Sequence, residues 1–384
     1  MPRVDSKTLS FHTLYGTPLS LYTGKARSYL IKNRIAYREV TPTTAHFASH
    51  VLPLAQRLSL PTLETSDGDV IRDGAAILDY FESRAGHPNS PAPPCQRILS
   101  DLLDVIGMEG LLRPAMHYRW NFPEENEAFL KHHFQALAPP GADASEIAQG
   151  GMGRMRQAAV SFGVVPEAFQ SIESRYLSLL AVLDQHFATQ PYLLGGRPCM
   201  GDFSLIAPFY GHLGRDPKPI SLMQAKAVNL FRWVERMNRP EPDSGEFRQG
   251  DPFTTPDTFP GNGEIPETLG PVLRQLAVDF VPETLAAAEY INDWLLGQNE
   301  LPSGTPLERG VGMASFEVEG SKVTALAQPY RFYLLSRVHA HFDAMGPAEQ
   351  KRVESMLEQF DLLPILSARL NRSIGRQDNH EVWL

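Results

Sequence analysis

Residues 11–27 read Phe11-His12-Thr13-Leu14-Tyr15-Gly16-Thr17-Pro18-Leu19-Ser20-Leu21-Tyr22-Thr23-Gly24-Lys25-Ala26-Arg27. The order predicts a short strand, then a loop that contains a proline, then a helix that a hydroxyl residue opens. The first turn of a helix has free N–H groups and a partial positive charge, so it favours a thiolate or another anion. A hydroxyl group there can also donate a hydrogen bond to a thiolate that a cofactor supplies. Ser20 is therefore the first candidate for chemistry.

The chain continues with alternating strands and helices up to about residue 85. Apolar residues recur at helical spacing after Ser20, and Ser66-Asp67-Gly68 between two short runs indicates a hairpin. Asp73 is a good cap for the helix that follows the hairpin. The predicted elements are strands at 9–14, 37–40, 62–65 and 69–72, and helices at 22–33, between 40 and 62, and from Asp73 to near Arg84. This order is that of a thioredoxin-like domain.

Two further stretches carry a specific resemblance. The first reads Leu58-Ser59-Leu60-Pro61-Thr62-Leu63, followed by Asp69-Val70-Ile71-Arg72-Asp73-Gly74-Ala75-Ala76-Ile77-Leu78-Asp79-Tyr80-Phe81. With the Ser20 helix start, it resembles the amino-terminal domain of a glutathione transferase. The second, Tyr192-Leu193-Leu194-Gly195-Gly196-Arg197-Pro198-Cys199-Met200-Gly201-Asp202-Phe203-Ser204-Leu205, resembles the signature of that family's helical domain, in which a buried aspartate starts a core helix. The resemblance covers roughly residues 8–240.

The resemblance implies that glutathione is a cosubstrate and that its thiolate attacks an electrophilic carbon. In that family, the helix start that Ser20 occupies carries the residue that activates glutathione. The residue before a cis-proline, here Leu60 before Pro61, pairs its backbone with the cysteinyl unit. Asp73 and the backbone of Gly74 would hold the γ-glutamyl end.

Two interpretations of Ser20 stay open. Its hydroxyl group could stabilise the thiolate, because each unit by which a thiol pKa falls below about 8.5 needs about 1.4 kcal/mol, and a hydrogen bond to an anion plus the helix end supplies that order of energy. Ser20 could instead only cap its helix. Tyr15 and Tyr22 are the nearest alternatives for the thiol contact. Thr23 stands where a Cys-x-x-Cys motif has its second cysteine, which argues against disulfide oxidoreductase chemistry.

Gly74 is the main departure from the family pattern. Many members have a serine or threonine after the acidic residue, whereas Gly74 offers only its backbone N–H to the γ-glutamyl carboxylate. Losing a hydrogen bond to a charged group costs roughly 1.5–3 kcal/mol, so glutathione could bind about ten- to a hundredfold more weakly. Lys25 and Arg27 could compensate, although we expect both on a solvated helix face. His46 and Arg57 are further possible sources.

A site for the second substrate is predicted at the end of the first long helix of the second domain. His117 and Trp120 lie there, and aromatic side chains with polar tips suit an aromatic electrophile. The alternative is that this helix end only packs against the segment after it. Further residues predicted to line the site are Tyr15, Tyr22 and Tyr210.

The chain divides into three predicted units. A thioredoxin-like domain covers 8–85, and four prolines among residues 86–94 form a stiff linker. A helical domain covers 95–240. The segment near 121–165 is polar, then rich in proline and glycine, and we expect it to be an insertion or a mobile cover that contains a little helix. A mainly helical extension covers 267–384. Its predicted elements are helices near 267–280 and 282–297, a hairpin at 316–323 with a Gly-Ser turn, and helices starting at Pro329 and Pro347.

Composition and net charge limit the kinds of partner that we expect for this protein. The formal net charge of the 384 residues is −9 and no basic block stands out, so we expect neither nucleic acid nor a membrane as a partner. The start of the chain lacks an apolar signal core, and no apolar run approaches the ~20 residues that span a bilayer. Cys95 and Cys199 have no metal-ligand spacing, so we expect no metal and a reduced, cytoplasmic setting. The family resemblance implies a homodimer, whose interface the extension could cover or replace.

These observations give one leading function and two alternatives. The first is a glutathione transferase-like enzyme that conjugates the thiolate to a small electrophile, aromatic or hydrophobic in character. A glutathione-dependent lyase, dehalogenase or isomerase would share the first domain and differ at the second site. A non-catalytic interaction module is the third possibility, which the missing hydroxyl at Gly74 and the long extension favour.

Overall fold

The computed structural model describes residues 11–240, 258–298 and 300–384. The first part of the chain is built on a four-stranded mixed sheet of order β2-β1-β3-β4. Strand β1 is parallel to β2 and antiparallel to β3, which is antiparallel to β4. The elements are β1 (His12–Tyr15), α1 (Leu21–Lys32), β2 (Tyr37–Val40), a π-helical turn (Phe47–Val51), α2 (Leu52–Ala55), β3 (Thr62–Glu64), β4 (Val70–Arg72) and α3 (Gly74–Ala85). The thioredoxin-like order is confirmed, while positions 9 and 10 of the predicted first strand lie outside the described residues.

A small apolar core holds this sheet to its helices. Leu14 of β1 pairs in register with Leu63 of β3, so both side chains lie on the same face of the sheet. They are fully buried together with Ala26, Leu30 and Ile77 from α1 and α3. This packing fixes the two helices whose first turns carry the predicted chemistry.

The second part of the chain is helical. Its elements are α4 (Pro94–Val105), a π-helical segment (Ile106–Gly110), α5 (Leu112–Trp120), α6 (Pro123–Gln135), α7 (Ala144–Ser161), a 3-10 turn (Pro166–Ala168), α8 (Phe169–Phe187), α9 (Met200–Gly211), α10 (Pro217–Lys226) and α11 (Val228–Arg236). Asp202 is buried at the start of α9, where Oδ2 accepts from the N–H of Cys199 at 2.9 Å and Oδ1 accepts from the indole N–H of Trp233 at 3.1 Å. The structural role predicted for Asp202 is confirmed.

The segment 121–165 contains more helix than its composition suggests. Asp143 caps α7 by accepting from the N–H groups of Ser145 and Glu146. One glycine of α7 allows close packing: a Cβ at Gly151 would lie 2.9 Å from the ring of Phe134 in α6. Helices α6 and α7 therefore stabilise each other through contacts that the local sequence does not reveal.

The extension adds helices and two small sheets. Its elements are α12 (Leu269–Leu296), β5 (Thr305–Pro306), β6 (Met313–Val318), β7 (Ser321–Leu326), α13 (Pro329–Asp343), α14 (Pro347–Glu358), a 3-10 turn (Leu363–Ser367), β8 (Ile374–Gln377) and β9 (His380–Trp383). Two predicted helices are one, because α12 continues through Pro282. The hairpin is confirmed, but its turn is Glu319-Gly320, both with positive φ. Among the helices of the described ranges, none has the length and apolar character needed to cross a membrane.

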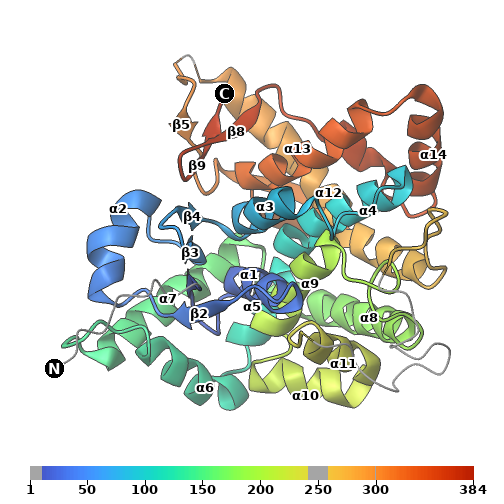
Figure 1. The fold of residues 1–384 in the computed structure, drawn as a ribbon. Helices are drawn as coiled ribbons and strands as arrows, with labels where there is room; N and C mark the ends of the chain where they lie inside the picture. Colours follow the sequence, from blue (N-terminus) through green and yellow to red (C-terminus); the bar gives the residue numbers. More distant parts are fainter. Residues whose placement is uncertain (1–10, 241–257, 299) are drawn as a thin grey trace.

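The extension covers β4, α3 and α4. Helix α13 packs against α4, and Arg337 of α13 pairs with Asp79 of α3 at 2.5 Å. The turn between β8 and β9 places Asn379 beside the outer edge of β4, and Figure 1 shows β9 close to β4. The amide of Asn379 accepts from the N–H of Arg72 and donates to the carbonyl of Val70, both at 3.0 Å. One side chain thus pairs an edge strand that would otherwise expose its backbone groups.

Replacing Asn379 with alanine is expected to release this edge. The N–H of Arg72 and the carbonyls of Val70 and Leu54 lose their partner, which lowers the free energy of unfolding by about 1–3 kcal/mol. Hydrogen exchange should become faster at the amide of Arg72. Asp378→Asn is the matched control, since this neighbour is exposed and has the positive φ that asparagine tolerates; equal exchange in the two variants would contradict the pairing.

Candidate functional site

The topology brings three predicted site segments to one end of the sheet. Strands β1 and β4 run in the same direction, because each is antiparallel to β3. Ser20 follows the carboxyl end of β1, and Asp73 follows the carboxyl end of β4. Leu60 and Pro61 precede the amino end of β3, which lies at that same end of the sheet. The fold therefore gathers the residues that the resemblance assigns to glutathione.

Ser20 caps α1 and keeps its own proton available. Its Oγ accepts a hydrogen bond from the N–H of Thr23 at 3.1 Å, as an N-cap does. A serine hydroxyl can donate one hydrogen bond as well as accept. Among the described residues nothing accepts from Ser20, which is half-buried. Capping and donation to a thiolate are therefore compatible at this residue.

Backbone groups at Leu60 and Gly74 are available for a ligand. The peptide bond between Leu60 and Pro61 is cis, as the sequence predicts. Within the parts of the chain that the structure describes, neither the N–H nor the C=O of Leu60 has a hydrogen-bond partner. The N–H of Gly74 points from the first turn of α3 and is also free there. Two donors and one acceptor without partners among the described residues thus lie at the same end of the sheet as Ser20.

Asp73 is engaged from two directions. Its Oδ1 accepts from the N–H groups of Ala75 and Ala76, at 2.8 and 3.2 Å, which caps α3. Its Oδ2 accepts from the phenolic O–H of Tyr330, which lies in α13 of the extension, at 2.8 Å. A carboxylate has about four lone-pair sites, so Oδ2 retains capacity for one more donor.

Tyr15 and Tyr22 have different surroundings. The phenolic O–H of Tyr15 donates to Glu64 at 3.0 Å, and its ring packs 4.9 Å from that of Phe47, so this hydroxyl already has a partner. Tyr22, in the first turn of α1, is half-buried. Burial and the nearby charge of Glu109 hold the pKa of Tyr22 well above its ordinary value, so its O–H remains a donor at neutral pH.

His117 and Trp120 lie in packed positions on α5. The Nε2 atom of His117 is 3.0 Å from Glu173 of α8, and burial lowers the pKa of this histidine. Trp120 packs 6.0 Å from Phe134 of α6, measured between ring centroids. Tyr210 lies elsewhere, on α9. The guanidinium groups of Arg27 and Arg215 lie 5.8 and 4.4 Å from the centre of its ring. In the described ranges, no hydrogen bond or ring contact joins any of these three residues to Ser20.

Lys25 and Arg27 are buried, and the expectation of a solvated helix face is wrong. The ammonium of Lys25 has no exposed surface and lies 2.6 Å from Asp104 of α4. Arg27 pairs with Glu39 at 2.6 Å. Helix α9 covers α1, since a Cβ at Gly211 would lie only 2.7 Å from the Cα of Leu21. Both cations are thus occupied and do not compensate for the missing hydroxyl at position 74.

The amino-terminal geometry agrees with a family comparison. Residues 14–90 match the model of the glutathione S-transferase N-terminal domain. The amino-terminal domain belongs to the glutathione S-transferase family. No curated protein matches the chain at the level of sequence.

Solved structures with similar folds cover about three fifths of the chain. The β-etherase LigF from Sphingobium sp. strain SYK-6 has 17% identity and a TM-score of 0.40, and the match covers 59% of this chain and 94% of that one. A theta class glutathione S-transferase from Xanthomonas axonopodis pv. citri, solved with glutathione bound, has 21% identity and a TM-score of 0.34, over 59% and 92% of the two chains. A glutathione transferase from Phanerochaete chrysosporium has 15% identity and a TM-score of 0.38, over 61% and 98%.

Sequence reasoning missed two polar residues near the glutathione S-transferase domain. Tyr330 reaches Asp73 from 257 positions away, and nothing in its local sequence indicates that contact. Glu109 is the other: it lies in the π-helical segment after α4 and is only 3% exposed. Its Oε2 is buried and, among the described residues, has no hydrogen-bond partner. An acidic residue inside an otherwise apolar helical run was the available signal.

Replacing Glu109 with glutamine is expected to stabilise the protein at high pH. Burial raises the pKa of this carboxyl from 4.5 to about 7. The folded state therefore binds more protons than the unfolded state between these values, and stability falls as the pH rises through that window. Urea titrations from about pH 5 to about pH 8 should show the variant gaining at least about 1.4 kcal/mol on the wild type, one pKa unit. A difference that stays constant with pH would contradict the shift.

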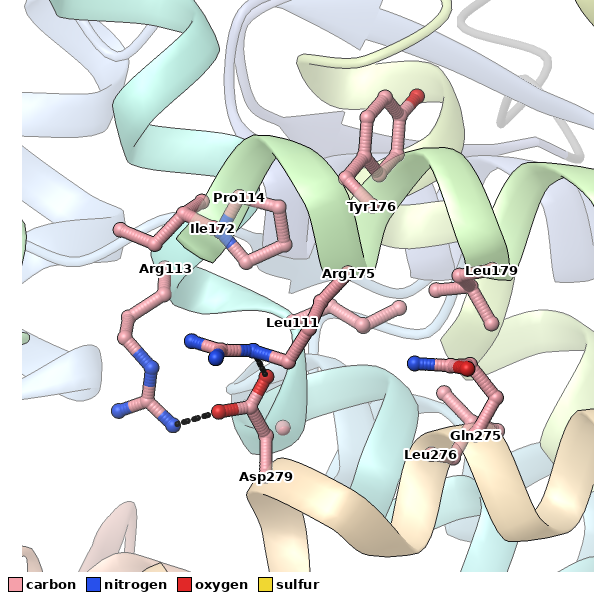
Figure 2. Close-up of a pocket in the computed structure, with 11 residues that line it drawn as sticks. Leu111, Arg113, Pro114, Ile172, Arg175, Tyr176, Leu179, Gln275, Leu276 and Asp279 are labelled. Atoms are coloured by element: carbon pink, nitrogen blue, oxygen red, sulfur yellow. Dashed lines mark hydrogen bonds and ion pairs between the residues drawn. The ribbon is translucent and has the colours of Figure 1, made fainter. Parts of the chain in front are cut away.

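A small cavity elsewhere in the helical domain is lined by a network of ion pairs. Figure 2 shows Arg113 of α5 and Arg175 of α8 converging on Asp279 of α12, at 3.2 and 3.0 Å, with the ring of Tyr176 turned away from them. The cavity measures about 20 Å³, which is room for one water molecule. Both guanidinium groups are neutralised, so we assign this network to stability. In the described parts of the chain, no three His, Cys, Asp or Glu side chains are grouped to hold a metal.

Proposed function

We propose that the chain is a glutathione-dependent enzyme that conjugates the glutathione thiolate to a small electrophile, aromatic or hydrophobic in character. The observation that carries the proposal is the set of free hydrogen-bonding groups at one end of the sheet. These are the O–H of Ser20, the N–H and C=O of Leu60, and the N–H of Gly74. Free groups of this kind, next to two helix N-termini, suit a peptide-like anion.

The residues present fit glutathione in part. The Leu60 backbone would pair with the cysteinyl unit, and Asp73 with the N–H of Gly74 would hold the γ-glutamyl end, as the resemblance implies. Tyr330 holds Oδ2 of Asp73 in place for an ammonium group. Position 74 has little spare room, because a Cβ there would lie 3.3 Å from the carbonyl oxygen of Tyr22. Because Gly74 has no side-chain hydroxyl, we expect glutathione to bind more weakly than it would to a site with a serine or threonine there.

Each residue has a defined part in the reaction. Glutathione supplies a thiol, the nucleophile, which leaves its proton to solvent on becoming a thiolate. The O–H of Ser20 donates to the sulfur, and the N-terminus of α1 adds a favourable potential, so the thiolate form is populated near neutral pH. Tyr22, in the first turn of α1, remains protonated and would serve as a second donor toward the electrophile. A lyase, dehalogenase or isomerase would use the same thiolate and differ only at the second substrate.

Calorimetric titration with reduced glutathione tests the proposal. The wild type should bind saturably in the micromolar-to-millimolar range. The Gly74→Ser variant should bind glutathione at least about tenfold more tightly than Gly74→Ala. The two variants share a Cβ and differ only by the hydroxyl that would reach the γ-glutamyl carboxylate. No heat of binding with any of the three proteins would reject glutathione as the cosubstrate.

A non-catalytic interaction module is the second candidate. It is favoured by the extension, because Tyr330 of the extension bonds to Asp73 and Asn379 of the extension pairs with the edge of β4. If the protein does not bind glutathione, the interaction module becomes the favoured function. As further parts of the proposal we retain a homodimer, which light scattering of the purified chain tests, and a cytoplasmic location, which the two free thiols of Cys95 and Cys199 support.

A further inference from the structure

Arg119 is a buried arginine near the end of α5 that reaches the loop before Ser20. Its side chain is 4% exposed and forms a two-point pair with Asp216, from Nε to Oδ2 at 2.7 Å and from Nη2 to Oδ1 at 2.8 Å. The side chain of Asp216, which precedes α10, has no exposed surface. Because the guanidinium is planar, this pair fixes its orientation and the directions of its remaining N–H groups.

Two backbone carbonyls accept the other N–H groups of Arg119. Nη2 donates to the carbonyl of Gly211 at 2.7 Å, and Nη1 donates to the carbonyl of Leu19 at 2.9 Å. Gly211 is the last residue of α9, and Leu19 directly precedes Ser20. One side chain of the helical domain thus connects the end of α9 to the loop that carries the proposed thiol contact.

The peptide unit before Ser20 is held at both of its polar atoms. Its oxygen, on Leu19, accepts from Arg119. Its N–H, on Ser20, donates to the carbonyl of Thr17 at 3.0 Å. Because a peptide unit is planar, these two bonds fix its orientation. The next carbonyl, that of Ser20, accepts from the N–H of Gly24 at 3.1 Å, so the backbone is held on both sides of Ser20.

Helix α9 also contacts this segment directly. A Cβ at Gly211 would lie 3.4 Å from the carbonyl carbon of Ser20 and 3.1 Å from the backbone nitrogen of Leu21, so glycine allows the two backbones to meet. The Oγ of Ser20 is then held by the hydrogen bond that it accepts from the N–H of Thr23. The hydroxyl hydrogen is the part of Ser20 that a ligand can still direct.

Arg119 contributes position to this loop, and little net charge. The carboxylate of Asp216 neutralises its guanidinium. The other titratable groups that face the pair are Arg215, His133 of α6 and His212 after α9. Burial lowers the pKa of both histidines, so both are neutral at neutral pH. A substitution that keeps the charge at position 119 therefore changes the geometry of the loop and not its electrostatics.

We propose that Arg119 is a positioning residue, which orients the hydroxyl of Ser20 toward the sulfur of glutathione from the helical domain. The inference rests on the proposed function. If the peptide unit before Ser20 can tilt, its hydroxyl no longer meets the sulfur at hydrogen-bond distance. A misplacement of about 1 Å can lower a rate about 100-fold. The thiolate then loses its donor, although the groups that bind the rest of glutathione are still present.

The Arg119→Lys variant tests the assignment. Lysine keeps the charge and can pair with Asp216, but it lacks the planar fork that also reaches Leu19 and Gly211. The pKa of the bound glutathione thiol, followed by the ultraviolet absorbance of the thiolate, should rise by about one unit, and kcat/KM at neutral pH should fall about tenfold with it. S-methylglutathione cannot form a thiolate, so its Kd should stay within about twofold of the wild-type value.

Arg113→Lys is the matched control. Arg113 lies on the same helix, is also 4% exposed and pairs with Asp279 and Glu283, without a bond to the Ser20 loop. This variant should leave the thiol pKa unchanged. Asp216→Asn gives a milder version of the test if Arg119→Lys does not fold. Asparagine can accept one bond from Arg119 but cannot form the charged two-point pair, so the thiol pKa should again rise.

The contrary outcomes are distinct. The positioning assignment is wrong, and the proposed function stands, if the thiol pKa does not rise in a folded Arg119 or Asp216 variant. The same conclusion follows if glutathione and S-methylglutathione lose affinity equally, because Arg119 would then only stabilise the fold. If calorimetry shows that the wild type binds no glutathione, both proposals fail.

Discussion

Replacing Asp104 with alanine is expected to lower the free energy of unfolding by about 3–5 kcal/mol. The reason is that the ammonium of Lys25 is fully buried and loses the carboxylate that pairs with it at 2.6 Å. The hydroxyl of Ser204, which also donates to Asp104, loses its acceptor. Because this ion pair joins α1 to α4, its loss should destabilise both the glutathione S-transferase domain and the helical domain. Urea denaturation followed by circular dichroism measures the change.

The double variant Lys25→Met, Asp104→Leu is the matched control. Replacing both members of a buried ion pair by apolar residues of similar volume is often neutral or stabilising. The double variant should therefore be more stable than Asp104→Ala by several kcal/mol. If the two variants were equally unstable, the loss would come from packing around position 104 and not from an uncompensated charge.

Replacing Ser20 with alanine is expected to reduce kcat/KM for conjugation by about 100- to 1,000-fold, the size of effect seen when one donor to a developing or bound anion is removed. The pKa of the bound glutathione thiol should rise, because its thiolate loses the O–H donor, and the pH–rate profile should move to higher pH. Stability should fall by only about 1 kcal/mol, which is the usual value of an N-cap. Steady-state kinetics over a range of pH, together with urea denaturation, separate the two effects.

Ser20→Asp separates capping from donation. Aspartate accepts from the N–H of Thr23 as well as serine does, so the cap and the stability should be retained. An ionised carboxylate has no proton to donate and repels a thiolate, so conjugation should be lost as in Ser20→Ala. Activity that survives in Ser20→Asp would show that Ser20 acts only as a cap.

Local patterns predicted the amino-terminal domain well, because its signals are short-range. The cap at Asp73, the cis-proline at position 61 and the Ser20 helix start depend on residues within a few positions. The burial of Lys25 was missed because it depends on α4 and α9, which lie far along the chain. A charged residue on a helix is by default expected at the surface, and only the distant Asp104 overrides that expectation.

The candidate site was predictable in its core and not at its border. Ser20, Asp73 and Gly74 follow the ends of strands, and Leu60 precedes the start of one, at the same end of the sheet. The contact of Tyr330 with Asp73 and the hydrogen bond from Arg331 to the carbonyl of Glu109 involve separations of 257 and 222 residues, which no local pattern encodes. The same holds for the edge of β4, where a single asparagine near the carboxyl terminus substitutes for a neighbouring strand.

Hydrogen exchange at Leu60 and Gly74 in the presence of reduced glutathione tests the central claim most directly. Both amides lack internal partners in the described structure, so they should exchange fast in the free protein. Saturating glutathione should slow both about tenfold or more, while the amide of Arg72, already paired with Asn379, should not change. Unchanged exchange at both Leu60 and Gly74 under saturating glutathione would contradict the site and the function built on it.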